Sequence, residues 1–162
     1  MPATPATTDT SESVPERARV MGVDAGAVRI GVALSDPDRL VATPLDTVPG
    51  VDAEAVRDNA AVRLAGLARA HGCDTVVVGL PRALSGRDTA STDLARRLAD
   101  SLQQQGLHVE LWDERLSSVE AERMLIGAGR RRRQRKQERD RVAATIILQG
   151  WLDAHRASPD SA

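Results

Sequence analysis

Three short apolar stretches near the start of the chain predict β-strands. They run from Arg19 to Asp24, from Arg29 to Leu34 and from about Val41 to Val48, and turn residues separate them. Since only a few residues lie between the first two stretches, we expect an antiparallel hairpin there. Pro44 has no backbone N–H to donate, so it predicts that the third stretch is an edge strand or an irregular one.

The pattern then alternates between helical and extended periods. Apolar residues spaced i, i+4, i+8 and i+11 predict a helix that ends near Gly72, and they are Val56, Ala60, Leu64 and Leu67. The β-branched run from Thr75 to Gly79 is typical of a strand buried on both faces. A second helical stripe, which stops at Gly106, consists of Leu94, Leu98 and Leu102. A last strand is predicted from His108 to Trp112.

The sequence after the last predicted strand, from Ser117 onward, predicts two more helices. Ser117 to Glu120 has the S-x-x-E form of a capping box, so a helix should begin there. The highly charged segment from Gly127 to Gln137 is predicted to be a loop, and a final helix should follow from about Glu138. Its expected apolar face consists of Val142, Ala143, Ile146, Ile147 and Trp151.

The predicted element order is β-β-β-α-β-α-β-α-α. A hairpin-type trio followed by right-handed crossovers gives an α/β fold, with a mixed sheet of five strands and helices on both faces. This is the element order of the ribonuclease H-like fold, although other α/β domains share it. We expect one domain over residues 18–154, because residues 1–17 are rich in Pro, Thr, Ser and Ala without an apolar period. Residues 1–17 should form a disordered arm and residues 155–162 a flexible tail.

Composition and charge narrow the classes of partner. Phe and Tyr are absent and Trp112 and Trp151 are the only aromatic residues, so base stacking contributes little and nucleic acid would be bound mainly through charge. The net charge of −1 hides an uneven distribution of charged residues along the chain. Residues 130–141 contain eight basic and two acidic residues, which gives a charge of +6 and leaves −7 on the rest of the chain.

Other classes of protein are disfavoured by what the sequence lacks. No apolar stretch approaches the roughly 20 residues that span a bilayer, so no membrane partner is expected. The first residues have neither the basic nor the apolar region of a secretory signal, which makes a cytoplasmic protein the default. Cys73 has no second cysteine to pair with and should be a partly buried thiol. The histidines have no metal-ligand spacing.

Four carboxylates stand at the edges of apolar elements. Asp24 ends the first strand, Asp113 and Glu114 end the last strand, and Asp140 lies in the first turn of the final helix. Asp140 shares helical spacing with the apolar positions Ala143, Ala144, Ile147 and Trp151. It should therefore point toward the sheet. Inward acids are costly unless they are paired or bind a metal, and Mg²⁺ prefers oxygen ligands. Two ions roughly 4 Å apart would suit phosphodiester cleavage.

Each of these acids also has an ordinary interpretation. Asp24 fits a turn beside Gly26, the acids at 113 and 114 could pair on the surface with Arg115, and Asp140 could favour the positive end of the helix dipole. The basic segment could be a solvated loop. The arrangement of the acids is more informative than any one of them.

The chain resembles the YqgF/RuvX family, whose proposed activity is processing of the 5′ end of the 16S rRNA precursor and which is related to Holliday junction resolvases. The resemblance covers residues 19–153 and rests on four blocks: VDAGAVRIGVALSD (Val23 to Asp36), VVVGLPRALSG (Val76 to Gly86), WDERLSSVEAE (Trp112 to Glu122) and KQERDRVAATIIL (Lys136 to Leu148). It implies a ribonuclease H-like, metal-dependent nuclease. The acids of the family match Asp24, Glu114 with Asp113, and Asp140 of this chain. Arg29 matches the arginine of the R-I-G sequence in the first block.

The main hypothesis is therefore an Mg²⁺- or Mn²⁺-dependent endonuclease acting on structured RNA. Asp24, Glu114 and Asp140 would hold the metal, with Asp113 as an alternative ligand. The residues expected to bind nucleic acid are Arg29, Arg130, Arg131, Arg132, Arg133, Arg135 and Lys136.

Three rivals stay open. The first is a resolvase acting on branched DNA, which would need a homodimer, although the sequence shows no clear dimer face. The second is a ribosome-assembly factor that binds nucleic acid without cleaving it. The third takes D-x-G as a phosphate loop of the actin and sugar-kinase type and ranks last, because one domain of this size lacks a second lobe.

Overall fold

The computed structural model describes residues 18–26, 28–50, 54–81, 85–114 and 132–156. For residues 54–58 and 132–140 it describes the helical backbone alone. The predicted capping-box helix at 117–120, the arm 1–17 and most of the tail 155–162 lie outside these ranges.

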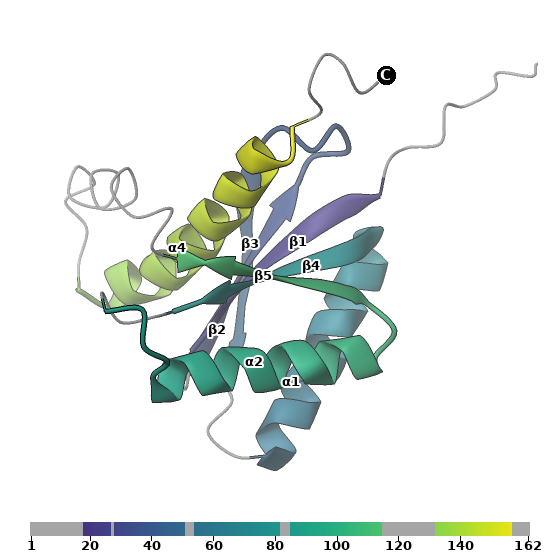
Figure 1. Cartoon of the computed structure of the whole chain (residues 1–162). Coiled ribbons are helices and arrows are strands. Elements are labelled where there is room, and N and C mark those ends of the chain that lie inside the picture. Colours follow the sequence, from purple (N-terminus) through teal and green to yellow (C-terminus); the bar gives the residue numbers. More distant parts are fainter. Residues whose placement is uncertain (1–17, 27, 51–53, 82–84, 115–131, 157–162) are drawn as a thin grey trace, which may run out of the picture.

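A five-stranded mixed sheet forms the centre of the fold, with strand order β3-β2-β1-β4-β5 (Figure 1). The strands are β1 (Arg19–Ala25), β2 (Arg29–Ser35), β3 (Ala42–Pro49), β4 (Cys73–Leu80) and β5 (His108–Asp113). β1 pairs antiparallel with β2 and β2 with β3, whereas β1–β4 and β4–β5 are parallel. The hairpin, the edge position of the strand that contains Pro44 and the mixed sheet are confirmed.

Helices cover both faces of this sheet. α1 (Glu54–Ala70) and α2 (Ala90–Gln104) lie on one face, and the long α4 (Arg132–Ala154) crosses the other (Figure 1). α1 and α2 end where the sequence predicted, because Gly72 and Gly106 adopt φ values of +68° and +87°. This left-handed conformation suits glycine and terminates a helix.

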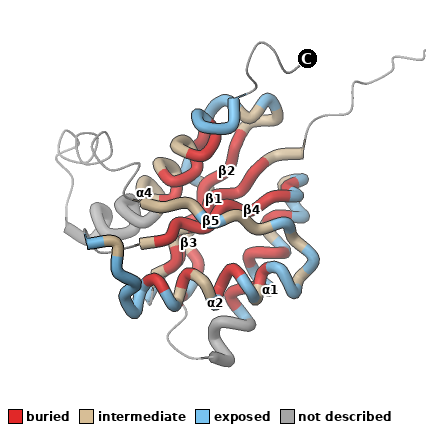
Figure 2. The backbone as a smooth tube through the Cα atoms, in the orientation of Figure 1, coloured by how far each residue is buried: buried red, intermediate tan, exposed pale blue. Residues whose placement is uncertain are grey.

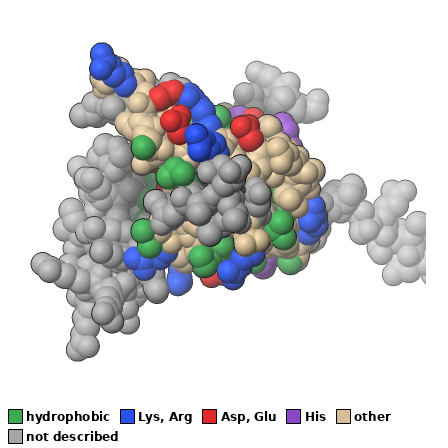
Figure 3. Space-filling view, turned by 90° about the horizontal axis from the view of Figure 1, so that it is seen from below, with side chains coloured by type: hydrophobic (Ala, Val, Ile, Leu, Met, Phe, Trp, Pro, Cys, Tyr) green, Lys and Arg blue, Asp and Glu red, His purple; other side chains and the backbone are tan. Residues whose placement is uncertain are grey.

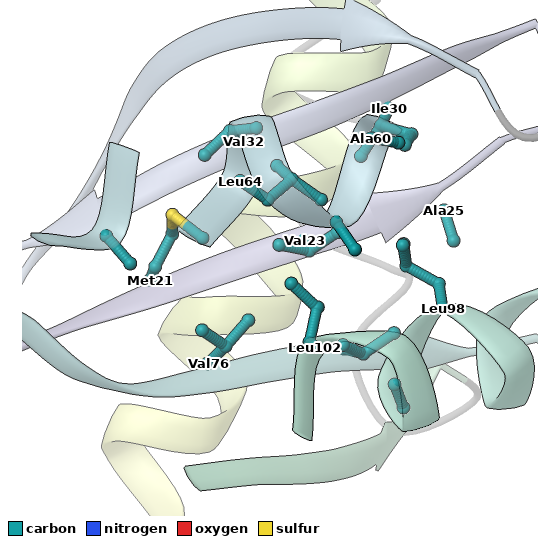
Figure 4. Close-up of a cluster of buried hydrophobic side chains, with 14 of the residues drawn as sticks. Met21, Val23, Ala25, Ile30, Val32, Ala60, Leu64, Val76, Leu98 and Leu102 are labelled. Carbon is teal, nitrogen blue, oxygen red and sulfur yellow. The ribbon is translucent and has the colours of Figure 1, made fainter. Parts of the chain in front are cut away.

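Two apolar cores follow from the alternation of side chains along the strands. The core under α1 and α2 contains Met21, Val23, Ile30, Leu64 and Leu98, with others (Figure 4). The core under α4 is lined by a second set, which includes Val20, Val77, Ala144, Ile147, Leu148, Trp151 and Leu152. Figure 2 shows this burial concentrated in the central strands and on the helix sides that face them. β4 is buried along nearly its whole length, as predicted.

Two predictions about the final helix are wrong. α4 begins at Arg132 rather than near Glu138, so part of the predicted loop is helical. Arg, Gln, Lys and Glu have high intrinsic helix propensity, and charge alone does not prevent a helix. The buried face is also rotated in part. The predicted Ile147 and Trp151 are buried, together with Ala144 and Leu148, whereas Val142, Ala143 and Ile146 are only half-buried.

No helix in the ranges that the structure describes is long and apolar enough to cross a membrane.

Candidate metal-binding acidic site

Asp24 occupies the end of β1 on the face that α4 covers. Its neighbour Val23 is buried in the core on the opposite face, and alternation along the strand directs Asp24 toward α4. Its partner in β2 is Gly31, and the preceding pair Val23–Val78 places Gly79 of β4 beside it on the other side. Glycines therefore flank Asp24 in the sheet, so neither neighbouring strand places a side chain against its carboxylate.

Glu114 directly follows β5 and lies over Gly79. A Cβ atom added at Gly79 would come within 2.7 Å of Glu114 Oε1 and would also overlap Ile147 Cδ1 of α4. The missing side chain thus creates the space that holds this carboxylate. Oε1 of Glu114 is buried and has no hydrogen-bond partner in the described part of the chain.

The Glu114 carboxyl is strongly perturbed by these surroundings. Its pKa is raised from 4.5 to about 8, mainly by burial and also by the charge of Asp24, a side-chain hydrogen bond with Asp24 and the charge of Asp113. The acids at the ends of β1 and β5 are therefore close enough to interact, as the sequence predicted. Near neutral pH and without a cation, this pair retains a proton.

Asp113 differs from Glu114 in its direction. It pairs with Leu80 at the end of β5. Trp112 packs into the core beneath α4, so alternation places Asp113 on the opposite face of the sheet. Asp113 is half-buried, and its charge acts on Glu114 from there.

Asp140 lies within α4, four and seven residues before the buried Ala144 and Ile147. Its backbone belongs to the described helix, whereas its side chain lies outside what the structure describes. The prediction that it joins Asp24 and Glu114 is therefore carried forward as a proposal.

The donors of this site fit a hard divalent cation. Mg²⁺ and Mn²⁺ favour carboxylate oxygens, and a buried carboxylate oxygen without a partner is satisfied by a bound cation. The described residues alone contain no group of three or more His, Cys, Asp or Glu side chains placed to hold a metal ion. Asp24 and Glu114 could each supply one oxygen ligand to such a cation.

The predicted nucleic-acid-binding residues are placed only in part. Arg29 begins β2 at the same end of the sheet as Asp24 and is half-buried. Residues 130–131 lie outside the described ranges, and the side chains at 132–136 are not among those described. Figure 3 shows one face of the molecule, on which acidic and basic side chains of the described residues are interspersed.

Two residues of this region were not singled out from the sequence. Gly79 could have been noticed, because an isolated glycine inside a strand pattern indicates close approach of another group. Arg141, whose side chain reaches Thr47 of β3, gave no separate signal within its run of charged residues.

Comparison with known proteins places the sequence in a family. Residues 18–154 match the family model described as "RuvX: Holliday junction resolvase". A protein of Clavibacter sepedonicus named "Putative pre-16S rRNA nuclease" is 49% identical over 142 residues, which are 85% of this chain and 84% of that protein. A protein of Mycolicibacterium smegmatis with the same name is 46% identical over 155 residues, 89% of this chain and 85% of that protein.

A solved structure supports the fold. The structure described as "T. thermophilus RuvC in complex with Holliday junction substrate" matches with a TM-score of 0.54 at 15% identity. The match covers 88% of this chain and 99% of that one. At this identity the likeness concerns the fold alone. The predicted ribonuclease H-like architecture and the resemblance to the YqgF/RuvX family are both confirmed.

Proposed function

This chain belongs to the family described as "RuvX: Holliday junction resolvase", and we propose that it is a metal-dependent endonuclease that processes the 5′ end of pre-16S rRNA. The observation that carries the proposal is the acid pair at one edge of the sheet, where Glu114 lies over Gly79 and interacts with Asp24. The names of the relatives supply the substrate.

Asp24, Glu114 and Asp140 would hold Mg²⁺ or Mn²⁺. Asp24 contributes from the end of β1 and Glu114 from the end of β5, so two rigid strands fix their separation. When bound, the metal would stabilise negative charge on the attacking and leaving oxygens of a phosphodiester. Asp113 is proposed to act through Glu114, whose pKa its charge raises.

The protein groups perform two further tasks. Glu114 retains a proton until a cation displaces it, which keeps two adjacent carboxylates from repelling one another in the free protein. The basic residues predicted from the sequence, Arg29 and those at 130–133, 135 and 136, would bind backbone phosphates. Such contacts give affinity that falls with salt and depends little on base sequence.

Replacement of Asp24 by Asn tests the proposal. We expect the variant to lose cleavage of an RNA that spans the 5′ end of pre-16S rRNA, in Mg²⁺ or Mn²⁺, while it still binds this RNA in Ca²⁺. Asp100→Asn is the matched control, because this exposed acid lies on α2, across the sheet from the site. Cleavage by Asp24→Asn at the wild-type rate would contradict the proposal.

A second candidate function follows from the description of the family as Holliday junction resolvases. A four-way DNA junction offers two equivalent scissile bonds and would need a homodimer of this chain. Parallel assays on the RNA and on such a junction, together with the mass of the protein in solution, separate the two functions. Binding of RNA without cleavage by the wild type would instead indicate an assembly factor.

A further inference from the structure

Arg141 carries a basic group to the edge of the acidic site. It is half-buried on α4, and its Nε donates a hydrogen bond of 3.2 Å to Oγ1 of Thr47 in β3. This contact joins residues 94 positions apart in the sequence. The direction of the guanidinium group is therefore set by tertiary structure rather than by the helix alone.

The register of the sheet places Thr47, the hydrogen-bond partner of Arg141, in one row with Asp24. Thr47 pairs with Gly31, and Gly31 pairs with Asp24. Paired residues on neighbouring strands direct their side chains to the same face, and two strand spacings amount to about 10 Å. The residue between Thr47 and Asp24 is a glycine, so no strand side chain stands between these two residues in this row.

Arg141 keeps its charge available. Its partner Thr47 is a neutral hydroxyl, which fixes the Nε edge of the guanidinium without neutralising it. Across the described ranges, no acidic side chain forms an ion pair with Arg141. A planar guanidinium held along one edge presents its remaining N–H groups as a fork, which matches two oxygens of a phosphate.

We propose that Arg141, oriented by Thr47, is a positioning residue that binds a backbone phosphate next to the scissile one. This inference rests on the proposed function, because it requires a nucleic-acid strand whose scissile phosphate lies at Asp24 and Glu114. The strand would cross the edge of the sheet from the acid pair toward β3, and its next phosphate would meet Arg141. The ligand chemistry is a phosphodiester, which RNA and DNA share.

A structural alternative has to be separated from this proposal. The hydrogen bond to Thr47 could serve only to join α4 to the edge strand β3, in which case its loss would change stability without changing nucleic-acid binding. The experiment therefore needs a readout that a purely structural role leaves unaltered. The dependence of affinity on salt is such a readout, because it counts phosphate contacts.

The test compares Arg141→Gln with the wild type. Binding is measured in Ca²⁺ on the pre-16S RNA fragment and on a four-way DNA junction, over a range of KCl concentrations. Loss of one phosphate contact should lower affinity about 10-fold at low salt and reduce the slope of log K against log salt by about 0.7 to 0.9. In cleavage, KM should rise about 10-fold while kcat stays within about 3-fold of the wild type.

Two further variants complete the design. Arg63→Gln removes an exposed charge on α1, on the opposite face of the sheet, and should leave the slope unchanged. Thr47→Val keeps the side-chain shape but frees the guanidinium, so it should raise KM by a smaller factor than Arg141→Gln and leave the salt slope unchanged. Urea unfolding establishes that each variant is folded under the assay conditions.

The possible results distinguish the proposed role of Arg141 from the proposed nuclease function. An Arg141→Gln protein with the wild-type salt slope and KM would overturn the positioning role and leave the nuclease function standing. A wild-type protein that binds RNA and never cleaves it would refute the nuclease function and, with it, the place of Arg141 next to a scissile phosphate; the salt slope would then report only whether Arg141 contacts a phosphate. A reduced slope on the DNA junction alone would assign the contact to DNA.

Discussion

Replacement of Glu114 by Gln should change how the stability of the metal-free protein depends on pH. The pKa of Glu114 is about 8 in the folded chain against an ordinary value of 4.5. Between these values the folded chain holds a proton that the unfolded chain has released, so the free energy of unfolding falls as pH rises. Gln cannot titrate and retains an amide that can donate to Asp24. The variant should therefore escape this loss of stability.

The structure sets the size of the effect. The interval from 4.5 to about 8 corresponds to at most about 5 kcal/mol, at 1.36 kcal/mol for each tenfold change in proton affinity. Glu114 is only half-buried, and solvent screening reduces that figure. We expect the free energy of unfolding of Glu114→Gln, relative to the wild type, to increase by about 2 kcal/mol between about pH 5 and about pH 8.5.

Urea denaturation in the presence of a chelator measures this difference at several pH values. Groups that titrate in both proteins cancel when the two curves are subtracted, so the remainder reports Glu114. Asp100→Asn, which removes an exposed acid on α2, should run parallel to the wild type at and above neutral pH. Parallel curves for Glu114→Gln and the wild type would refute the raised pKa of Glu114.

Three further predictions concern the site and its support. Gly79→Ala should lower cleavage at least 10-fold, because the new Cβ displaces the Glu114 carboxylate and misplacement by about 1 Å can cost about 100-fold. Gln149→Ala should lower the free energy of unfolding by about 1–2 kcal/mol in urea titrations, since Gln149 Oε1 accepts the Ala42 N–H at 2.9 Å. Mn²⁺ should raise Tm more at about pH 8.5 than at about pH 6, because protonated Glu114 competes with the ion, and it should not raise Tm in Asp24→Asn.

Matched variants sharpen these predictions. A Cβ at Gly22 would come within 2.6 Å of Leu148 Cβ and 3.0 Å of the Ala144 carbonyl oxygen, beneath the same helix but away from the acids. Gly22→Ala should therefore destabilise the fold and keep turnover per folded molecule. The same result for Gly79→Ala would contradict the proposal that the space over Gly79 holds the Glu114 carboxylate in its active position. Gln149→Glu keeps the acceptor for the Ala42 N–H but loses the donor to the Leu40 carbonyl and to Asp153 Oδ1, so it should not restore wild-type stability.

The sequence by itself determined the strands, most helix ends and the candidate acids. Period two and period 3.6 are properties of the local chain, and so are the missing N–H of Pro44 and the left-handed conformation of Gly72. The position of Asp24 at the end of its strand was also readable, because strand ends coincide with the end of an apolar run. These features need no knowledge of what packs against them.

Only the tertiary structure decided which groups meet. The start of α4 and the rotation that buries Leu148 in place of Ile146 depend on how the helix packs across the sheet. The space over Gly79 for Glu114 and the reach of Arg141 to Thr47 likewise join segments far apart in the sequence. Side-chain direction, burial and the resulting pKa are set by neighbours that local periodicity does not specify, because the energy that fixes them comes from packing between distant elements.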